Sequence, residues 1–133
     1  MVTTENGTVP RWTHDGRSIA FVSIGRDKDF VSIIDTAGGR SRKLATSRGV
    51  GARLNSVAVG PDASVVYFRA VDSTGVNSLY SVGVAGGRPR LLARLDDPRR
   101  RPRRHEFATD SKRLYFTMSD DDSDIWVMEL RKR

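Results

Sequence analysis

The chain repeats itself three times, and this repetition constrains its fold more than any other feature. The stretch WTHDGRSIAFVS at residues 12–23 places an Asp-Gly turn before an apolar run. The pattern returns as VAVGPDASVVYFRA at residues 57–70 and as HEFATDSKRLYFTM at residues 105–118, so that the turn aspartates are Asp15, Asp62 and Asp110. A fixed period of this length indicates supersecondary units that pack on their neighbours.

A second element follows each turn in the same order. VSIIDTAGGRSRKLAT at residues 31–46 matches LYSVGVAGGRPRLLAR at residues 79–94, and IWVMELRKR at residues 125–133 begins a third copy. The segments are short, rich in Val, Ile, Phe and Tyr, and bounded by Gly, Asp and Ser, which is typical of strands. For the first unit we predict strands at residues 9–13, 18–23, 31–35 and 41–45, with hairpin turns at the Gly-Gly pairs. No segment shows a helical period.

Four antiparallel strands in about 47 residues are typical of a β-propeller blade. We therefore predict an all-β, single-domain protein of about three blades, at residues 5–47, 48–95 and 96–133. The second strand is apolar on both faces, which indicates sheets covered on both sides by neighbouring blades. The third unit ends before its fourth strand, and residues 1–4 resemble residues 44–46, so they are predicted to close the last blade. The chain is then a half or partial propeller, either a piece of a larger ring or completed by dimerisation.

These motifs resemble the TolB-like, PD40-type (WD40-like) propeller repeat. The residues that carry the resemblance as structural motifs are Trp12, Asp15, Gly16, Phe21, Asp62, Phe68, Asp110, Phe116 and Trp126. We interpret Trp12 and Phe21 as blade-packing residues. Ala63 and Ser111 depart from the pattern, because they stand where the repeat has its turn glycine. The resemblance implies a bacterial, non-catalytic module that binds a protein or small ligand through its rim loops, and it implies a periplasmic or other extracytoplasmic location.

The composition limits the classes of protein that the chain can belong to. Hydrophobic residues make up 38% and charged residues 29%, which favours a folded globular protein over disorder. The chain has no cysteine, so disulfides and thiolate metal sites are excluded. No run of about 18 apolar residues predicts a membrane span, and MVTTENGTVP shows no signal-peptide pattern. The compartment stays open.

A basic cluster is the strongest candidate for binding. The net charge is +7, and the candidate ligand- or partner-binding residues are Arg99, Arg100, Arg101, Arg103, Arg104 and His105. They fall in residues 96–103 and just beyond, one of five segments predicted to share one rim, with residues 25–28, 48–53, 72–76 and 119–124. Guanidinium groups bind carboxylate or phosphate bidentately, which makes nucleic-acid or polyanion binding a second alternative. No aromatic residues are interleaved to stack bases. A solvated loop of weak ion pairs is the interpretation that we favour.

Other chemistry has less support. Carboxylates at Asp120, Asp121, Asp122 and Asp124 would suit Ca²⁺, but they lack EF-hand spacing, so we expect a charged loop. His14 and His105 have no spaced partner for zinc, and no Gly-x-Ser-x-Gly elbow is present. We therefore expect no cofactor and no catalytic residue. The alternative is the propeller part of a larger enzyme or receptor with an active site in its channel.

Overall fold

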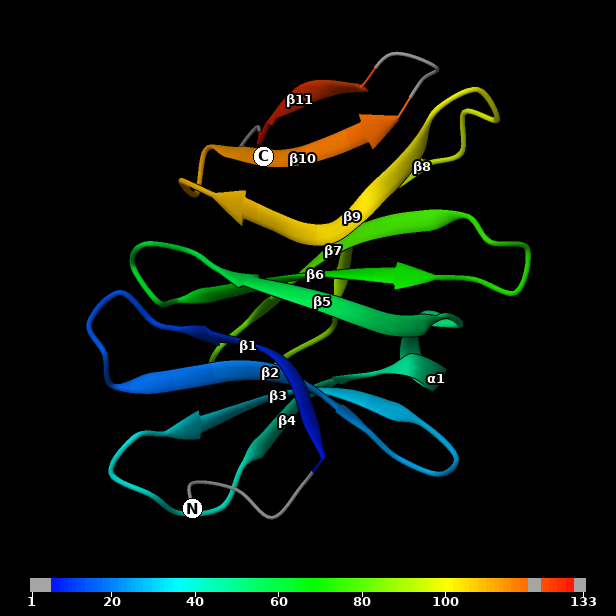
Figure 1. Ribbon diagram of the computed structural model, residues 1–133. Coiled ribbons are helices and arrows are strands. Elements are labelled where there is room, and N and C mark those ends of the chain that lie inside the picture. The colour runs from blue at the N-terminus through cyan, green and yellow to red at the C-terminus, as the bar shows by residue number, and fades with distance from the viewer. Residues whose placement is uncertain (1–5, 120–122, 131–133) are drawn as a thin grey trace.

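The computed structural model describes residues 6–119 and 123–130, which form strands joined by short connections and one single-turn helix (Figure 1). The elements are β1 (Gly7–Trp12), β2 (Ser18–Ile24), β3 (Asp29–Asp35), β4 (Arg42–Thr46), α1 (Ser47–Val50), β5 (Arg53–Val59), β6 (Val65–Val71), β7 (Asn77–Gly83), β8 (Arg90–Leu95), β9 (Arg101–Thr109), β10 (Arg113–Ser119) and β11 (Ser123–Glu129). No helix among these residues is long and apolar enough to cross a membrane.

The strands form three antiparallel sheets, and each sheet is one blade. Blade 1 has the order β1-β2-β3-β4 and blade 2 the order β5-β6-β7-β8. Blade 3 has the order β11-β10-β9, with three strands among the described residues. The predicted all-β fold of partial-propeller blades is confirmed. Residues 1–4, predicted to close the last blade, lie outside the described residues.

The first strand of every blade lies at the inner edge of its sheet. β5 contacts both β1 and β9, and Figure 1 shows these three strands side by side at the front while the remaining strands fan away. This is the arrangement of strands around a propeller axis. The connections β2–β3, β4–β5, β6–β7 and β8–β9 lie together on the right of Figure 1, as predicted for the rim, and the aspartate turns lie on the opposite side.

The two faces of a blade pack on different neighbours. We call the face that carries Phe21, Phe68 or Phe116 the phenylalanine face, and the other the reverse face. The reverse face of blade 1, with Ala20 and Val31, packs on the phenylalanine face of blade 2 in one buried core. The reverse face of blade 2 packs in the same way on blade 3, in a second core. Every described blade therefore uses the same face toward the same side, as the repeat requires.

The residue after the turn aspartate has a positive φ in all three blades. Gly16 has φ 68°, and its amide donates to the Thr13 carbonyl at 2.9 Å. Ala63 and Ser111 replace this glycine, yet they hold φ values of 56° and 69°. A side chain with a Cβ is strained in this left-handed region by about 1–2 kcal/mol. The departures from the repeat thus preserve the positive φ of this residue at a cost in stability.

Two predictions about individual residues need correction. Residues 101–104 were predicted to lie in a loop, but β9 begins at Arg101 and runs to Thr109. Between the pairs Pro102↔Met118 and Phe107↔Phe116, β9 holds three residues more than β10, so residues 103–106 form a wide bulge. Trp12 was interpreted as a packing residue, but it is 63% exposed, whereas Phe21 on the same face is 3% exposed.

Candidate binding site on the rim

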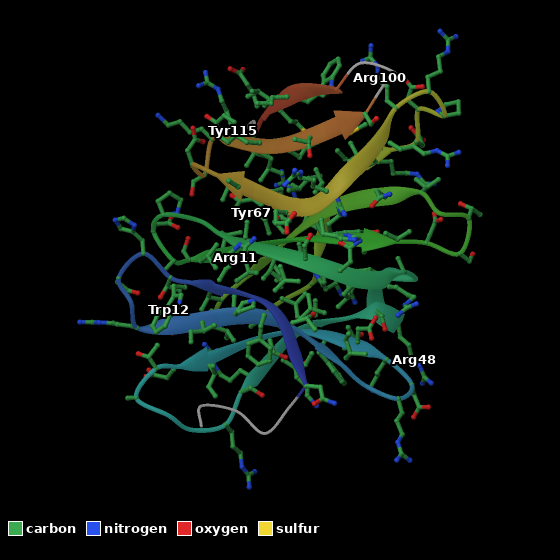
Figure 2. All side chains as sticks on the ribbon, in the orientation of Figure 1. Arg11, Trp12, Arg48, Tyr67, Arg100 and Tyr115 are labelled. Atoms are coloured by element: carbon green, nitrogen blue, oxygen red, sulfur yellow. The ribbon has the colours of Figure 1, made fainter. Side chains whose placement is uncertain are left out.

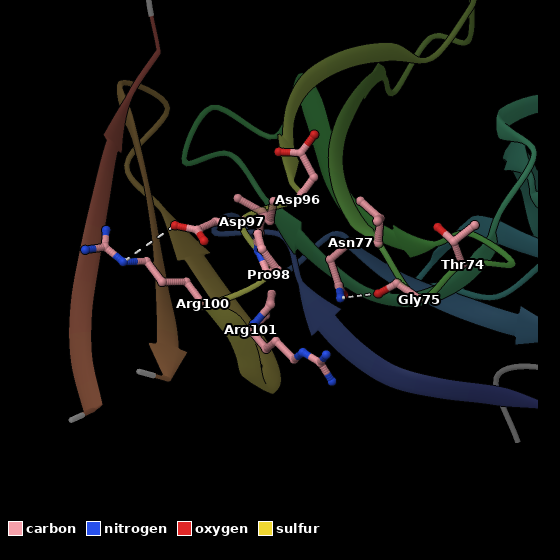
Figure 3. A pocket seen from close by; sticks show the side chains of 11 residues that line it. Thr74, Gly75, Asn77, Asp96, Asp97, Pro98, Arg100 and Arg101 are labelled. Atoms are coloured by element: carbon pink, nitrogen blue, oxygen red, sulfur yellow. Dashed lines mark hydrogen bonds and ion pairs between the residues drawn. The ribbon is translucent and has the colours of Figure 1, made fainter. Parts of the chain in front are cut away.

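A pocket of about 360 Å³ opens on the rim at the junction of blades 2 and 3 (Figure 3). The β6–β7 connection and the start of β7 form one wall. The β8–β9 connection and the start of β9 form the other. The residues that line it are Thr74, Gly75, Val76, Asn77, Leu95, Asp96, Asp97, Pro98, Arg100, Arg101 and Pro102. Both walls are connections between strands, which is where propellers have room for variation.

Asp72 holds the first wall in shape. Its Oδ1 accepts hydrogen bonds from the Thr74 hydroxyl at 2.6 Å, the Thr74 amide at 2.9 Å and the Val76 amide at 3.0 Å. The bonds from the Thr74 hydroxyl and the Val76 amide lower the pKa of this carboxyl, so it stays ionised. Arg94 lies 3.5 Å from its Oδ2. The Asp72 carboxylate therefore stabilises its own loop.

Asp97 plays the same part in the second wall. Its Oδ1 accepts from the Arg99 amide at 2.9 Å, and its carbonyl accepts from the Arg100 amide at 3.1 Å, which closes an Asx-type turn that contains Pro98 and leads into β9. The Arg100 guanidinium lies 3.9 Å from the Asp97 carboxylate and 4.3 Å above the ring of Trp126 in β11. Arg100 thus joins the rim connection to blade 3 by an ion pair and a cation–π contact.

Arg101 is the charged residue of the pocket that forms no ion pair and no cation–π contact with another described residue. Its side chain is exposed, and its guanidinium makes no hydrogen bond or ion pair with another described residue. Figure 3 shows it reaching from the start of β9 toward the wall that carries Asn77 and Gly75. The acidic neighbours Asp96 and Asp97 are each within 4 Å of another arginine. The pocket therefore presents one unpaired guanidinium beside backbone amides and carbonyls.

The predicted basic cluster is divided among several environments. Arg99 lies in the turn, and Arg100 and Arg101 line the rim pocket. Arg104 instead lines a second cavity, on the reverse face of blade 3. The side chain of Arg103 is outside what the structure describes. The bulge in β9 separates these positions, and the sequence does not show that bulge.

His105 meets an arginine that the sequence analysis missed. Arg69 of β6 is 3% exposed. Its Nε donates to Asn55 Oδ1 at 3.1 Å, its Nη1 to the Arg104 carbonyl at 2.6 Å, and its Nη2 lies 2.9 Å from His105 Nδ1. Burial lowers the pKa of this guanidinium and the nearby Glu106 raises it, so it remains a cation. One charged residue in the apolar run VVYFRAV was the signal.

The remaining candidates are the acidic residues proposed for Ca²⁺ and His14. Asp120, Asp121 and Asp122 lie outside the described residues, as does the side chain of Asp124. Among the side chains that are described, no group of three or more His, Asp or Glu residues is arranged to hold a metal ion. His14 is exposed next to the Asp15-Gly16 turn.

Comparison with known proteins relates the fold to one class. No protein-family model matches the chain, and no curated protein matches it in sequence. A candidate TolB from Agrobacterium tumefaciens superposes with a TM-score of 0.75 at 18% identity, over 97% of this chain and 48% of that one. TolB from Acinetobacter baumannii gives 0.70 at 18% identity, over 94% and 30%. The β-propeller domain of the Trilobed protease from Pyrococcus furiosus gives 0.67 at 13%, over 96% and 40%.

The fold is thus a TolB-like β-propeller repeat fold, and the chain spans less than half the length of these similar structures. Identities this low relate the folds and not the activities. The chain is a propeller module.

Proposed function

We propose that this propeller module is a non-catalytic binding protein that takes a carboxylate-bearing segment of a protein, or a small carboxylate ligand, in the rim pocket. The observation that carries the proposal is the pocket of about 360 Å³ with the unpaired Arg101 guanidinium. Asp96 and Asp97 each lie within 4 Å of another arginine, so the Arg101 guanidinium is the charged group of the pocket that is left without an ion-pair partner. Guanidinium recognises carboxylate in a planar, bidentate way. The resemblance to TolB-like proteins agrees with protein binding and with a role outside the cytoplasm.

A direct binding assay tests this proposal. Fluorescence anisotropy of a fluorescein-labelled hexaglutamate peptide should rise on adding the protein, and a hexaglutamine peptide should give no rise. Arg101→Gln should weaken binding about tenfold, which corresponds to about 1.4 kcal/mol. The matched control is Arg40→Gln, because Arg40 is an exposed arginine in the β3–β4 connection on the opposite rim. Equal weakening by the two substitutions would contradict the assignment of the pocket.

The second alternative, nucleic-acid or polyanion binding, is separated in the same assay. A labelled single-stranded oligonucleotide replaces the peptide, and salt is varied. Steep loss of affinity with salt and equal effects of both substitutions would indicate contact with many phosphates through the net positive charge. Binding confined to the peptide, with an effect at Arg101 alone, supports the pocket.

A further inference from the structure

The cavity on the reverse face of blade 3 has a volume of about 440 Å³ and is separate from the rim pocket. Most of its lining comes from β9, β10 and β11 of blade 3, and Arg11 of β1 completes it from blade 1. Figure 2 labels Arg11 in blade 1 and Tyr115 in blade 3, which are two of the lining residues. A volume of this size is in the range of pockets that bind small organic molecules.

The floor of the cavity is an apolar part of the sheet. Ala108 pairs with Tyr115, and Ile125 pairs with Thr117, so these four residues share the reverse face. Ile125 is 78% exposed, whereas its repeat equivalent in blade 1, Val31, is 0% exposed. An exposed apolar surface of this kind marks a place where a ligand or partner binds.

Two arginines and one glutamate surround this floor. Arg104 and Glu106 are exposed, and neither side chain makes a hydrogen bond or ion pair with another described residue. Arg11 donates from Nη1 to the Pro10 carbonyl at 3.1 Å, which leaves it further donors. Burial lowers the pKa of the Arg69 guanidinium and the nearby Glu106 carboxylate raises it, so the charge of Glu106 is balanced by Arg69. Arg11 and Arg104 therefore give the edge of the cavity a positive charge.

A buried hydroxyl on the floor lacks a hydrogen-bond partner. Thr117 lines the cavity, and its Oγ1 is buried without a hydrogen bond to any described residue. Its repeat equivalent in blade 1 is Val22, which is 1% exposed, so packing alone needs only a valine at this position. A buried polar group without a partner requires an explanation. An oxygen atom of a molecule in the cavity would give this hydroxyl the partner that it lacks.

We propose that this cavity binds a small aryl carboxylate that carries an oxygen substituent on its ring. The ring lies on the floor formed by Tyr115 and Ile125, where apolar area is buried and the tyrosine ring favours an aromatic neighbour. The carboxylate binds the guanidinium groups of Arg11 and Arg104. The Thr117 hydroxyl donates to the oxygen substituent. The site shares no residue with the rim pocket and does not depend on the function proposed for it.

Isothermal titration calorimetry of the full chain tests the class of ligand. The probes are para-coumarate, a flat aryl carboxylate with a ring hydroxyl, and cinnamate, which lacks that hydroxyl. Para-coumarate should bind about three- to tenfold more tightly than cinnamate, since one hydrogen bond distinguishes them. The neutral amide of para-coumarate should bind about tenfold or more weakly, because it cannot pair with the guanidinium groups. No binding of either carboxylate at millimolar concentration, or equal binding of the neutral amide, would overturn the proposal.

Three substitutions locate the ligand. Arg104→Gln should weaken para-coumarate binding about tenfold, and it keeps the backbone carbonyl that Arg69 binds. Arg99→Gln is its matched control, because Arg99 is an exposed arginine of the same basic cluster but does not line the cavity. Ile125→Asp should abolish binding, whereas Leu91→Asp, which changes an exposed leucine on β8, should leave it unchanged. Equal weakening by either control would refute the assignment.

Thr117→Val separates binding from folding. It should remove the preference for para-coumarate over cinnamate while the urea midpoint does not fall, because the hydroxyl has no partner within the described protein. An unchanged preference would show that Thr117 does not contact the ligand and would overturn this part of the proposal. Sedimentation velocity covers the other occupant of an apolar sheet face. A dimer that Ile125→Asp abolishes would show that a second copy covers this face, and it would overturn the proposal.

Discussion

Replacing Arg69 by methionine should be among the most destabilising single changes in the junction between blades 2 and 3. Methionine keeps most of the volume but removes the three donor groups that bind Asn55, Arg104 and His105. Asn55 Oδ1 keeps the Ser56 hydroxyl at 3.3 Å as a donor, and the exposed His105 can be hydrated. The Arg104 carbonyl loses its 2.6 Å partner. A buried acceptor left unsatisfied costs about 1–3 kcal/mol, and this bond is partly buried, so the lower half of that range applies.

With a smaller contribution from the other two acceptors, the free energy of unfolding should fall by about 2–3 kcal/mol. The loss is moderated because burying the guanidinium also had a desolvation cost, which methionine does not carry. Urea denaturation followed by circular dichroism measures the change. At a slope of about 1–3 kcal/mol per molar urea, the midpoint should fall by about 1 M or more.

Arg94→Met is the matched control, because Arg94 belongs to the same blade and its side chain is half exposed while paired with Asp72. Exposed ion pairs contribute about 0.2–1 kcal/mol, so this change should be small. If Arg69→Met and Arg94→Met lower stability by the same amount, the three hydrogen bonds do not stabilise the junction and the reasoning is refuted.

Three smaller effects can be measured on the same protein. Ala63→Gly should raise the free energy of unfolding by about 0.5–1 kcal/mol in urea melts, because glycine adopts the positive φ without strain. Gly16→Ala imposes that strain and should lower the free energy of unfolding by about 1 kcal/mol. Effects of the opposite sign would contradict the strain. The Thr13 hydroxyl, then the Arg17 amide, lowers the pKa of Asp15 from its usual 3.8, so its stabilising contribution is present above about pH 4 and is lost as pH falls through the folded value. Lowering the pH from 6 to 2.5 should therefore lower the urea midpoint less for Asp15→Asn than for the wild type. An equal fall in the two proteins would show that the hydrogen bonds of Asp15 do not stabilise the fold. Thr117→Val should be neutral or stabilising by up to about 1 kcal/mol, since the buried Thr117 hydroxyl has no hydrogen-bond partner within the described residues, and a clear loss of stability would show an unrecognised partner.

The repeat made the architecture predictable, because the same turn residues and the same apolar alternation occur in every blade. Asp15, Asp62 and Asp110 each begin a turn whose hydrogen bonds are between near neighbours in sequence. The apolar alternation of the second strands then sets which face packs on which blade. Strand ends differed by one or two residues, as at β3, which begins at Asp29 rather than at residue 31. Such differences follow from pairing with a neighbouring strand, which a local pattern does not contain.

The candidate site was predictable in position but not in composition. The rim connections were assigned to one side, and Arg100 and Arg101 do line a pocket there. The partners of these arginines were not visible, because Trp126 and Arg100 meet only when β11 folds back beside the β8–β9 connection. The bulge at residues 103–106 moved Arg104 to another face. Periodicity assumes regular strands, so an irregular strand is where it fails.

The same repeat position explains why the pocket lies where it does. Val22 in blade 1 is an ordinary core residue, but its equivalent in blade 2 is Arg69. A buried cation needs acceptors, and the bulge of β9 supplies the Arg104 carbonyl by releasing it from strand pairing. The bulge begins directly after Pro102, the last residue of the pocket wall. The hydrogen bond from Arg69 to the Arg104 carbonyl holds the bulge, and we expect it to contribute to the position of Arg101 at the start of the same strand. We therefore expect Arg69→Met to lower both the stability of the protein and its affinity for the hexaglutamate peptide. Ala63→Gly, in contrast, should change stability alone.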